Sequence, residues 1–164
     1  MNYDIRKICN YINEVHSRYY VDTNGVIYTS MSNATNRIMI NGERKNINKI
    51  RKNKLEYLNK TNKMIVELED FKNYYLLYNG EILQRLKTIV KQNDYVEIHL
   101  VTINNNERKC YSLSRIVAQC FIGNVEGREI HHIDRNRKNN KINNLQIMTF
   151  EEHRGKINFK KNHN

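Results

Sequence analysis

The chain has 164 residues, 28 of them lysine or arginine and 17 aspartate or glutamate, which gives a net charge of +11 and a pI of about 9.6. An excess of basic residues this large indicates that the partner is a polyanion, most simply nucleic acid. The alternative is a soluble basic protein without such a partner. No run approaches the ~18 apolar residues of a membrane span, and the three cysteines form no C-x-x-C pair, which argues against a disulfide framework or a zinc knuckle.

The segment from Asp4 to His16 has helical periodicity. Its apolar residues fall on one face at helical spacing: Ile5, Ile8, Cys9, Ile12 and Val15. We therefore expect a helix here that packs on a sheet. Residues 1–4 lack the pattern of a secretory signal, and reduced cysteines in a cytoplasmic location are expected.

Two aromatic-rich segments, 19–28 and 74–83, each contain an Asn-Gly pair at their centre, at Asn24-Gly25 and Asn79-Gly80. Asn-Gly between strand-forming residues predicts a hairpin, because a type I′ turn needs positive φ at both central positions. A Glu-Arg-Lys triplet follows each hairpin, at 43–45 and 107–109. We therefore predict two related units, at about 17–60 and 72–121, each a small antiparallel sheet followed by a helix.

Residues 44–63 form a basic segment with Glu56 as its lone acid. Its lysines and arginines are at positions 44, 45, 49, 51, 52, 54, 60 and 63. An imperfect apolar stripe favours a helix, and the segment is either a solvated face or linker, or an arm that follows the phosphate backbone of nucleic acid. We predict the second, with contacts from Lys49, Arg51, Lys52 and Lys54.

The alternating segment 95–101 predicts a strand that pairs with residues 108–111. Ser112 or Ser114 then caps a helix that runs to Phe121. Residues 123–127 turn the chain into the segment that carries its most distinctive residues.

Residues 130–134 read Ile-His-His-Ile-Asp and open a strand–loop–strand–helix pattern. A polar loop at 135–143 follows, and residues 144–148 alternate as a strand does. Thr149 and Glu152 form a capping box, which opens a helix with His153 in its first turn.

This pattern resembles the HNH, or ββα-metal, endonuclease family, in the form found in phage intron-encoded and free-standing homing endonucleases. The motif residues are His131, His132, Asp134, Asn136, Asn139, Asn140, Asn144, Leu145, Thr149 and His153, with residues 113–118 and Phe121 upstream. The resemblance covers about the last third of the chain. Two positions depart from the family: Arg135 stands where glycine is usual, and Ser114 where histidine is usual.

The resemblance implies roles for the three histidines and for Asn144. His131 and His153 would be the metal ligands, and His132 the general base. Asn144 would hold the loop and orient the base. Asp134 is expected either to brace the loop or to accept a hydrogen bond from a group that supports the metal ligands. Loop cations would neutralise phosphate or form a solvated charge run: Arg135, Arg137, Lys138 and Lys141.

The expected cofactor is a divalent cation, Mg²⁺ or Mn²⁺, with Ni²⁺, Co²⁺ or Zn²⁺ also possible because two imidazoles suit these ions. The expected partner is DNA, with no membrane, no small-molecule substrate and an undetermined oligomeric state. A phage-encoded chain would act in the host cytoplasm.

We therefore predict an α+β fold of small antiparallel sheets with helices, followed by a C-terminal ββα-metal motif. Residues 1–110 would form the DNA-binding region and residues 111–164 the nuclease module. The expected function is metal-dependent hydrolysis of DNA phosphodiester bonds. The rival hypothesis is a sequence-specific DNA-binding protein that keeps the scaffold without catalysis. A structural zinc module would need four ligands.

Overall fold

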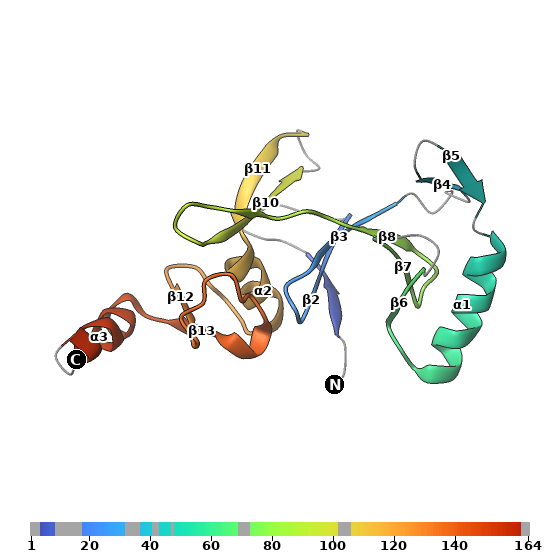
Figure 1. The fold of residues 1–164 in the computed structure, drawn as a ribbon. Helices are drawn as coiled ribbons and strands as arrows, with labels where there is room; N and C mark the ends of the chain where they lie inside the picture. Colours follow the sequence, from blue (N-terminus) through green and yellow to red (C-terminus); the bar gives the residue numbers. More distant parts are fainter. Residues whose placement is uncertain are drawn as a thin grey trace. The chain divides into compact units, whose positions relative to one another are not determined.

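A computed structural model describes residues 4–8, 18–31, 37–40, 43–46, 48–68, 73–101 and 106–161 (Figure 1). The fold is α+β, with antiparallel sheets and helices, as predicted. The chain forms two compact units. The first comprises Met1–Lys7, Arg18–Asp22 and Val26–Leu86, and the second Ile8–Ser17, Thr23–Gly25 and Lys87–Asn164.

The first unit is built on a six-stranded sheet in which every neighbouring pair is antiparallel. In spatial order its strands are β1 (Ile5–Lys7), β2 (Tyr19–Asp22), β3 (Ile27–Ser30), β8 (Ile82–Arg85), β7 (Tyr74–Leu77) and β6 (Ile65–Glu67). The two predicted hairpins, β2–β3 and β7–β8, therefore lie side by side in one sheet, joined through the β3–β8 pair.

Both hairpins turn at their Asn-Gly pair, but the turns are not type I′. Among the described residues of these turns only the glycines have positive φ, 75° at Gly25 and 85° at Gly80. In the second hairpin Gly80 N donates to Leu77 O, and Leu77 N donates to Glu81 O, both at 2.9 Å. This is a type I turn followed by a left-handed residue, the usual geometry of a three-residue hairpin loop.

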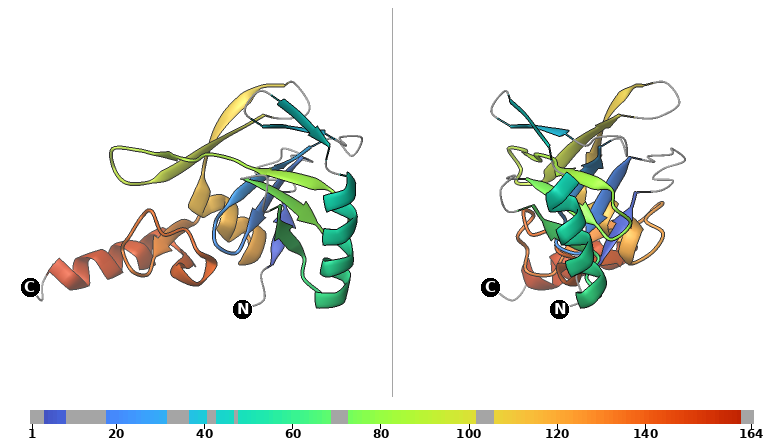
Figure 2. Two further views of the ribbon diagram at one scale, coloured as in Figure 1. Left: turned by 45° about the vertical axis from the view of Figure 1, so that its right-hand side comes forward. Right: turned by 90° about the vertical axis from the view of Figure 1, so that its right-hand side faces the viewer.

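Helix α1 (Asn48–Thr61) covers part of this sheet (Figures 1 and 2). Leu58, which is 1% exposed, packs in a cluster with Leu68, Tyr74, Leu76 and Ile82. The predicted helix in the basic segment is thus confirmed, whereas the preceding Glu43–Asn46 forms strand β5, paired with β4 (Arg37–Ile40).

The N-terminal prediction was wrong in part, because Ile5–Lys7 is a strand paired with β2. Ile5 and Ile8 are both buried, as a helix would also place them, but here Ile5 pairs with Asp22 at the edge of the sheet. Pairing with β2 satisfies backbone groups that a short helix would leave open at its start. The rest of the predicted helix, residues 9–16, lies outside the described residues.

The second unit contains a three-stranded sheet, in spatial order β11 (Arg108–Ser112), β10 (Val96–Val101) and β9 (Ile89–Val90). Helix α2 (Leu113–Phe121) follows directly and buries Leu113, Ile116, Val117 and Ala118. It contacts β10 and β11 as well as β12 (Glu129–His132) and β13 (Leu145–Met148). Helix α2 therefore joins the three-stranded sheet to the β12–β13 pair within the segment Lys87–Asn164 of this unit.

The C-terminal part follows the predicted order of strand, loop, strand and helix. β12 pairs antiparallel with β13, after a loop that ends in a single 3₁₀ turn at Ile142–Asn144. Helix α3 (Phe150–Lys161) begins with the predicted capping box. Glu152 N donates to Thr149 Oγ1 at 3.2 Å, and Thr149 N donates to Glu152 Oε2 at 2.7 Å.

Among the described residues, no helix combines the length and apolar character needed to cross a bilayer.

Candidate active site

Strand β12 and helix α3 bring His131 and His153 together. His131 lies opposite Gln146 in the β12–β13 pair, and His153 occupies the first turn of α3, where its N–H donates to Thr149 O at 3.1 Å. The two ring centroids are 5.4 Å apart, with the ring planes at 69°. The capping box fixes where α3 begins, and therefore where His153 lies along it.

This pair of imidazoles fits the donor set of a divalent cation. Two imidazoles bound to one tetrahedral ion at about 2.0–2.1 Å per bond place their centroids roughly 5 Å apart, close to the separation of the His131 and His153 rings. The described residues contain no cluster of three or more His, Cys, Asp or Glu side chains that could hold a metal. Water and substrate oxygens would therefore complete the coordination of an ion here.

His132 faces the other side of β12, since adjacent strand residues point to opposite faces. It is 5% exposed, and its Nε2 lies 3.1 Å from Oδ1 of Asn140. The ring of Tyr95 meets the imidazole edge to face, with centroids 6.2 Å apart. The sequence pattern predicted the opposite orientations of His131 and His132 but neither of these contacts.

Asn144 holds the loop between the two strands, as predicted. Its Oδ1 accepts from Asp134 N at 2.9 Å, and its Nδ2 donates to Asp134 Oδ1 and to Asn139 O, both at 2.8 Å. Asn144 is 6% exposed, so its amide meets these partners from a buried position. Its predicted second task, orienting His132, stays a prediction; the described side-chain hydrogen bond of His132 is with Asn140.

The Asp134 carboxylate is the acceptor at the centre of this loop, which agrees with its predicted bracing role. Asn139 Nδ2 donates to it at 2.7 Å and Asn136 N at 2.8 Å. The hydrogen bond from Asn139, followed by those from Asn136 and Asn144, lowers the pKa of Asp134 below its usual value. The carboxylate is therefore ionised at neutral pH and keeps accepting these bonds.

Arg135, which stands where the family usually has glycine, keeps the left-handed conformation that glycine would adopt, with φ at 62°. It is the one described residue with positive φ that is not glycine, asparagine or aspartate. Such a conformation costs an ordinary side chain about 1–2 kcal/mol. Within the described part of the chain, the exposed Arg135 side chain has no hydrogen-bond or ion-pair partner that would offset this cost.

We expect Arg135→Gly to raise the free energy of unfolding by about 0.5–1 kcal/mol, because glycine relieves the strain but gains more entropy when the chain unfolds. Chemical denaturation would measure the change. Arg135→Ala retains the strained backbone and serves as the control, with no comparable gain. A glycine variant less stable than the parent would contradict this account of the turn.

Two of the other loop cations are engaged by the turn before β10. Arg137 Nη1 donates to Asn93 O at 3.1 Å, and its guanidinium lies 4.6 Å from the ring centroid of Tyr95. Lys138 Nζ lies 2.9 Å from Asp94 Oδ1. Lys141, like Arg135, is exposed.

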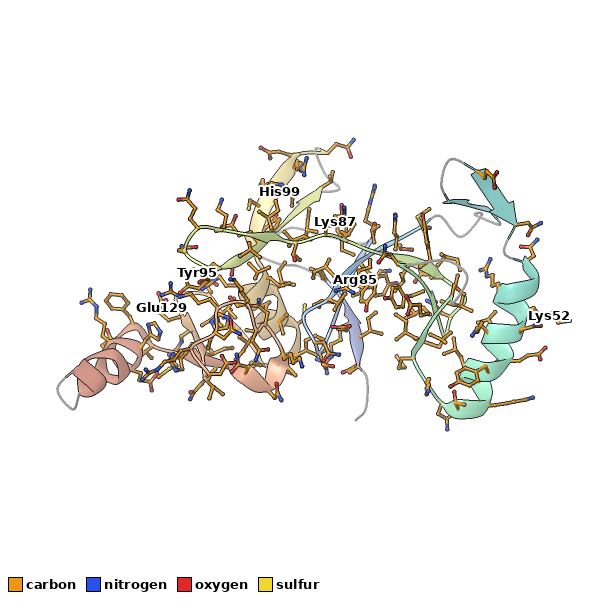
Figure 3. The ribbon with its side chains drawn as sticks, in the orientation of Figure 1. Lys52, Arg85, Lys87, Tyr95, His99 and Glu129 are labelled. Atoms are coloured by element: carbon orange, nitrogen blue, oxygen red, sulfur yellow. The ribbon has the colours of Figure 1, made fainter. Side chains whose placement is uncertain are left out.

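The predicted phosphate contacts on α1 differ in their surroundings. Arg51 Nη2 donates to Gly80 O at 2.6 Å, so this side chain holds the helix on the β7–β8 turn. Lys52 is exposed and lies on the side of α1 away from the sheet (Figure 3). Lys54 is half-buried, and the side chain of Lys49 lies outside the described residues.

Sequence reasoning missed Tyr95 and Gly25 as parts of this site. Tyr95 comes from the turn before β10, about 37 residues before His132, and is labelled in Figure 3. A Cβ on Gly25 would lie 2.8 Å from Asn140 O, so only glycine permits this approach. The Asn-Gly pair predicted a turn, but nothing near it in the sequence indicated that Gly25 also contacts the loop at Asn140.

Comparisons with known proteins agree with this arrangement. The sequence model of a family described as HNH endonuclease matches residues 111–155. The uncharacterized HNH endonuclease L245 of Acanthamoeba polyphaga mimivirus is 32% identical over 88 residues, which are 50% of this chain and 26% of that protein. The HNH homing endonuclease I-HmuI, described as binding and cleaving DNA, has a similar structure, with a TM-score of 0.54 and 18% identity over 97% of this chain and 59% of its own.

The resemblance to the HNH family is thereby confirmed for the C-terminal motif, and the likeness to I-HmuI confirms the fold class. The chain spans about a quarter of the length of the viral relative and less than two thirds of I-HmuI.

Proposed function

Because the chain carries an HNH endonuclease motif in residues 111–155, we propose that it is a metal-dependent endonuclease that hydrolyses DNA phosphodiester bonds. The observation that supports this most directly is the arrangement of three histidines on two elements. His131 and His153 lie 5.4 Å apart between ring centroids, and His132 is held separately against Asn140. One imidazole is thus available as a base while two others form a cation-binding pair.

In the proposed reaction His132 accepts a proton from a water molecule. The water oxygen forms a bond to phosphorus, and the bond between phosphorus and O3′ breaks with its electron pair on O3′. O3′ then takes a proton from solvent, which gives a 5′-phosphate and a 3′-hydroxyl, and His132 returns its proton to solvent. An imidazole suits this task because its ordinary pKa lies near 6.5.

His131 and His153 would hold the cation. A bound divalent ion polarises phosphoryl oxygens and stabilises negative charge on a departing oxygen. Asn144 and Asp134 contribute indirectly, because their hydrogen bonds fix the loop between β12 and β13. β12 carries His131 and His132, and β13 leads into α3, which carries His153.

Arg135 and Lys141 are the loop cations best placed for phosphate, since both are exposed. Arg137 and Lys138 are exposed too, but their charges already meet Asn93, Tyr95 and Asp94. On α1, Lys52 offers an exposed ammonium. Contacts of this kind position a protein on DNA without reading its sequence. A homing or free-standing phage endonuclease remains the role that the resemblance favours.

The rival hypothesis is a DNA-binding protein without catalysis, which the net charge of +11 would serve equally well. A plasmid-nicking assay with and without EDTA separates the two. The endonuclease hypothesis is supported if supercoiled plasmid is converted to nicked or linear forms and EDTA abolishes this conversion. Retention of plasmid in a mobility shift with no cleavage in any divalent metal would establish the binder.

We expect Mn²⁺, Co²⁺ or Ni²⁺ to support cleavage at least as well as Mg²⁺, because two imidazoles form the cation-binding pair and Mg²⁺ prefers oxygen ligands. Initial nicking rates in each metal at equal concentration measure this preference. The variant His153→Asp, which supplies an oxygen ligand, should shift the preference toward Mg²⁺. A parent enzyme much more active in Mg²⁺ than in the other three ions would contradict the prediction.

A further inference from the structure

The side-chain amide of Asn140 is held in one orientation by the loop. Its Nδ2 lies 3.2 Å from Lys138 O and 3.4 Å from Arg137 O. Backbone carbonyls only accept hydrogen bonds, so the NH₂ group must face them and the amide oxygen must face the other way. Asn140 is 4% exposed, which leaves no bulk water to stabilise the reverse orientation.

The oxygen fixed in this way determines which nitrogen of His132 carries hydrogen. Nε2 of His132 lies 3.1 Å from Asn140 Oδ1. An amide oxygen only accepts, so Nε2 must donate, and in a neutral imidazole the other nitrogen, Nδ1, then has no hydrogen. We propose that Asn140 is a positioning residue that selects the Nε2–H tautomer of His132 and leaves Nδ1 to accept the proton from water. This inference rests on the proposed function.

The surroundings of the imidazole prevent it from turning over. The Tyr95 ring meets His132 edge to face, and Tyr95 is itself covered by the guanidinium of Arg137, 4.6 Å from its ring centroid. Arg137 is tied in turn to Asn93 O. Because His132 is 5% exposed, a ring flip would need these neighbours to move.

A segment outside the HNH motif also positions Asn140. The segment Thr23–Gly25 belongs to the same compact unit as the loop. Thr23 O accepts from Ile142 N at 2.9 Å, and a Cβ on Gly25 would lie 2.8 Å from Asn140 O and 3.2 Å from Asn140 Cβ. A glycine at position 25 therefore lets the loop approach closely enough for Asn140 to take its place.

The tautomer can be read directly by NMR. Long-range proton–nitrogen correlation spectra of ¹⁵N-histidine-labelled protein, at about pH 8 where an ordinary imidazole is neutral, distinguish a protonated ring nitrogen from a bare one. We expect His132 in the parent chain to show a protonated Nε2 and a bare Nδ1. A bare Nε2 with a protonated Nδ1 would overturn the inference.

Substitutions at Asn140 test its part in the rate. Asn140→Leu has a similar volume but no acceptor, and we expect the tautomers to become mixed and kcat to fall about 10- to 100-fold with little change in DNA affinity. Asn140→Asp keeps an acceptor oxygen toward His132 and should restore the Nε2–H tautomer and part of kcat, while folding stability falls because the donations to Lys138 O and Arg137 O are lost. An Asn140→Leu variant with the parent tautomer and kcat would overturn the inference.

The matched control is Asn139→Leu, because Asn139 donates to Asp134 rather than contacting His132. We expect its folding stability to fall while the His132 tautomer stays unchanged. A change of tautomer in this control would show that the loop as a whole, and not Asn140, sets it. A parent chain that cleaves no DNA yet has the Nε2–H tautomer would refute the proposed function while supporting the assignment to Asn140. A cleaving chain with a bare Nε2 would refute the assignment alone.

Discussion

Replacing His132 by alanine is expected to lower the rate of DNA cleavage by about 10²- to 10⁴-fold, the usual contribution of a positioned general base. DNA affinity should change little, because His132 is 5% exposed and its described partners are Asn140 and Tyr95. The lysine and arginine side chains proposed to contact DNA are other residues, such as Lys141 and Lys52. The loss should therefore appear in kcat, measured as single-turnover nicking of plasmid in Mn²⁺.

His99→Ala is the matched control for this variant. His99 lies on β10 of the same unit, paired with Cys110 of β11, and belongs to no part of the proposed site (Figure 3). Its Nδ1 has no hydrogen-bond partner among the described residues, so its removal breaks no bond at that atom. A parent-like rate in His132→Ala, or an equal loss of activity in His99→Ala, would contradict the assignment of His132 as the base.

Features determined within a few residues of sequence could be predicted. The capping box at Thr149 and Glu152 depends on a spacing of three residues, and the structure forms both of its hydrogen bonds. The opposite facing of His131 and His132 follows from strand geometry alone. Because the start of α3 was predictable, so was the placement of His153 in its first turn.

Contacts between distant parts of the sequence could not be predicted. The meeting of Tyr95 with His132, and of Gly25 with Asn140, joins residues on separate elements that no local pattern connects. The same holds for the β3–β8 pair, which unites two hairpins expected in separate sheets. Ile5 was assigned to a helix because Ile5 and Ile8, both buried, are three residues apart, as on one face of a helix. The same spacing also occurs here, where Ile5 begins a short strand and Ile8 follows its end.

At Arg135 the hydrogen bonds of the loop override the preference of the residue for negative φ. An arginine alone disfavours positive φ, yet Arg135 N donates to His132 O, and Asp134 beside it is fixed by Asn144. The hydrogen bonds of the loop determine its backbone path, and Arg135 must follow it. A strained residue is retained most readily where it serves a function, which accords with the phosphate contact proposed for this side chain.

Asn144→Ala is expected to have the largest effect on stability. It removes three hydrogen bonds from a buried position, one of them to the ionised Asp134, and leaves Asn139 O and Asp134 N without their partner. Such bonds contribute about 0.5–1.5 kcal/mol each, and more when one partner is charged. We expect the free energy of unfolding to fall by about 3 kcal/mol, and Tm by roughly 10 °C, with cleavage lost in parallel.

Asn143→Ala provides the comparison, because Asn143 lies in the same 3₁₀ turn but is exposed. Its effect should stay within about 0.5 kcal/mol, as for most surface substitutions. Asn144→Asp should not rescue the loop, since a second carboxylate would face Asp134 and the donations to Asp134 and Asn139 would be lost. Denaturation curves that superimpose for Asn144→Ala and Asn143→Ala would show that the Asn144 hydrogen bonds do not hold the loop.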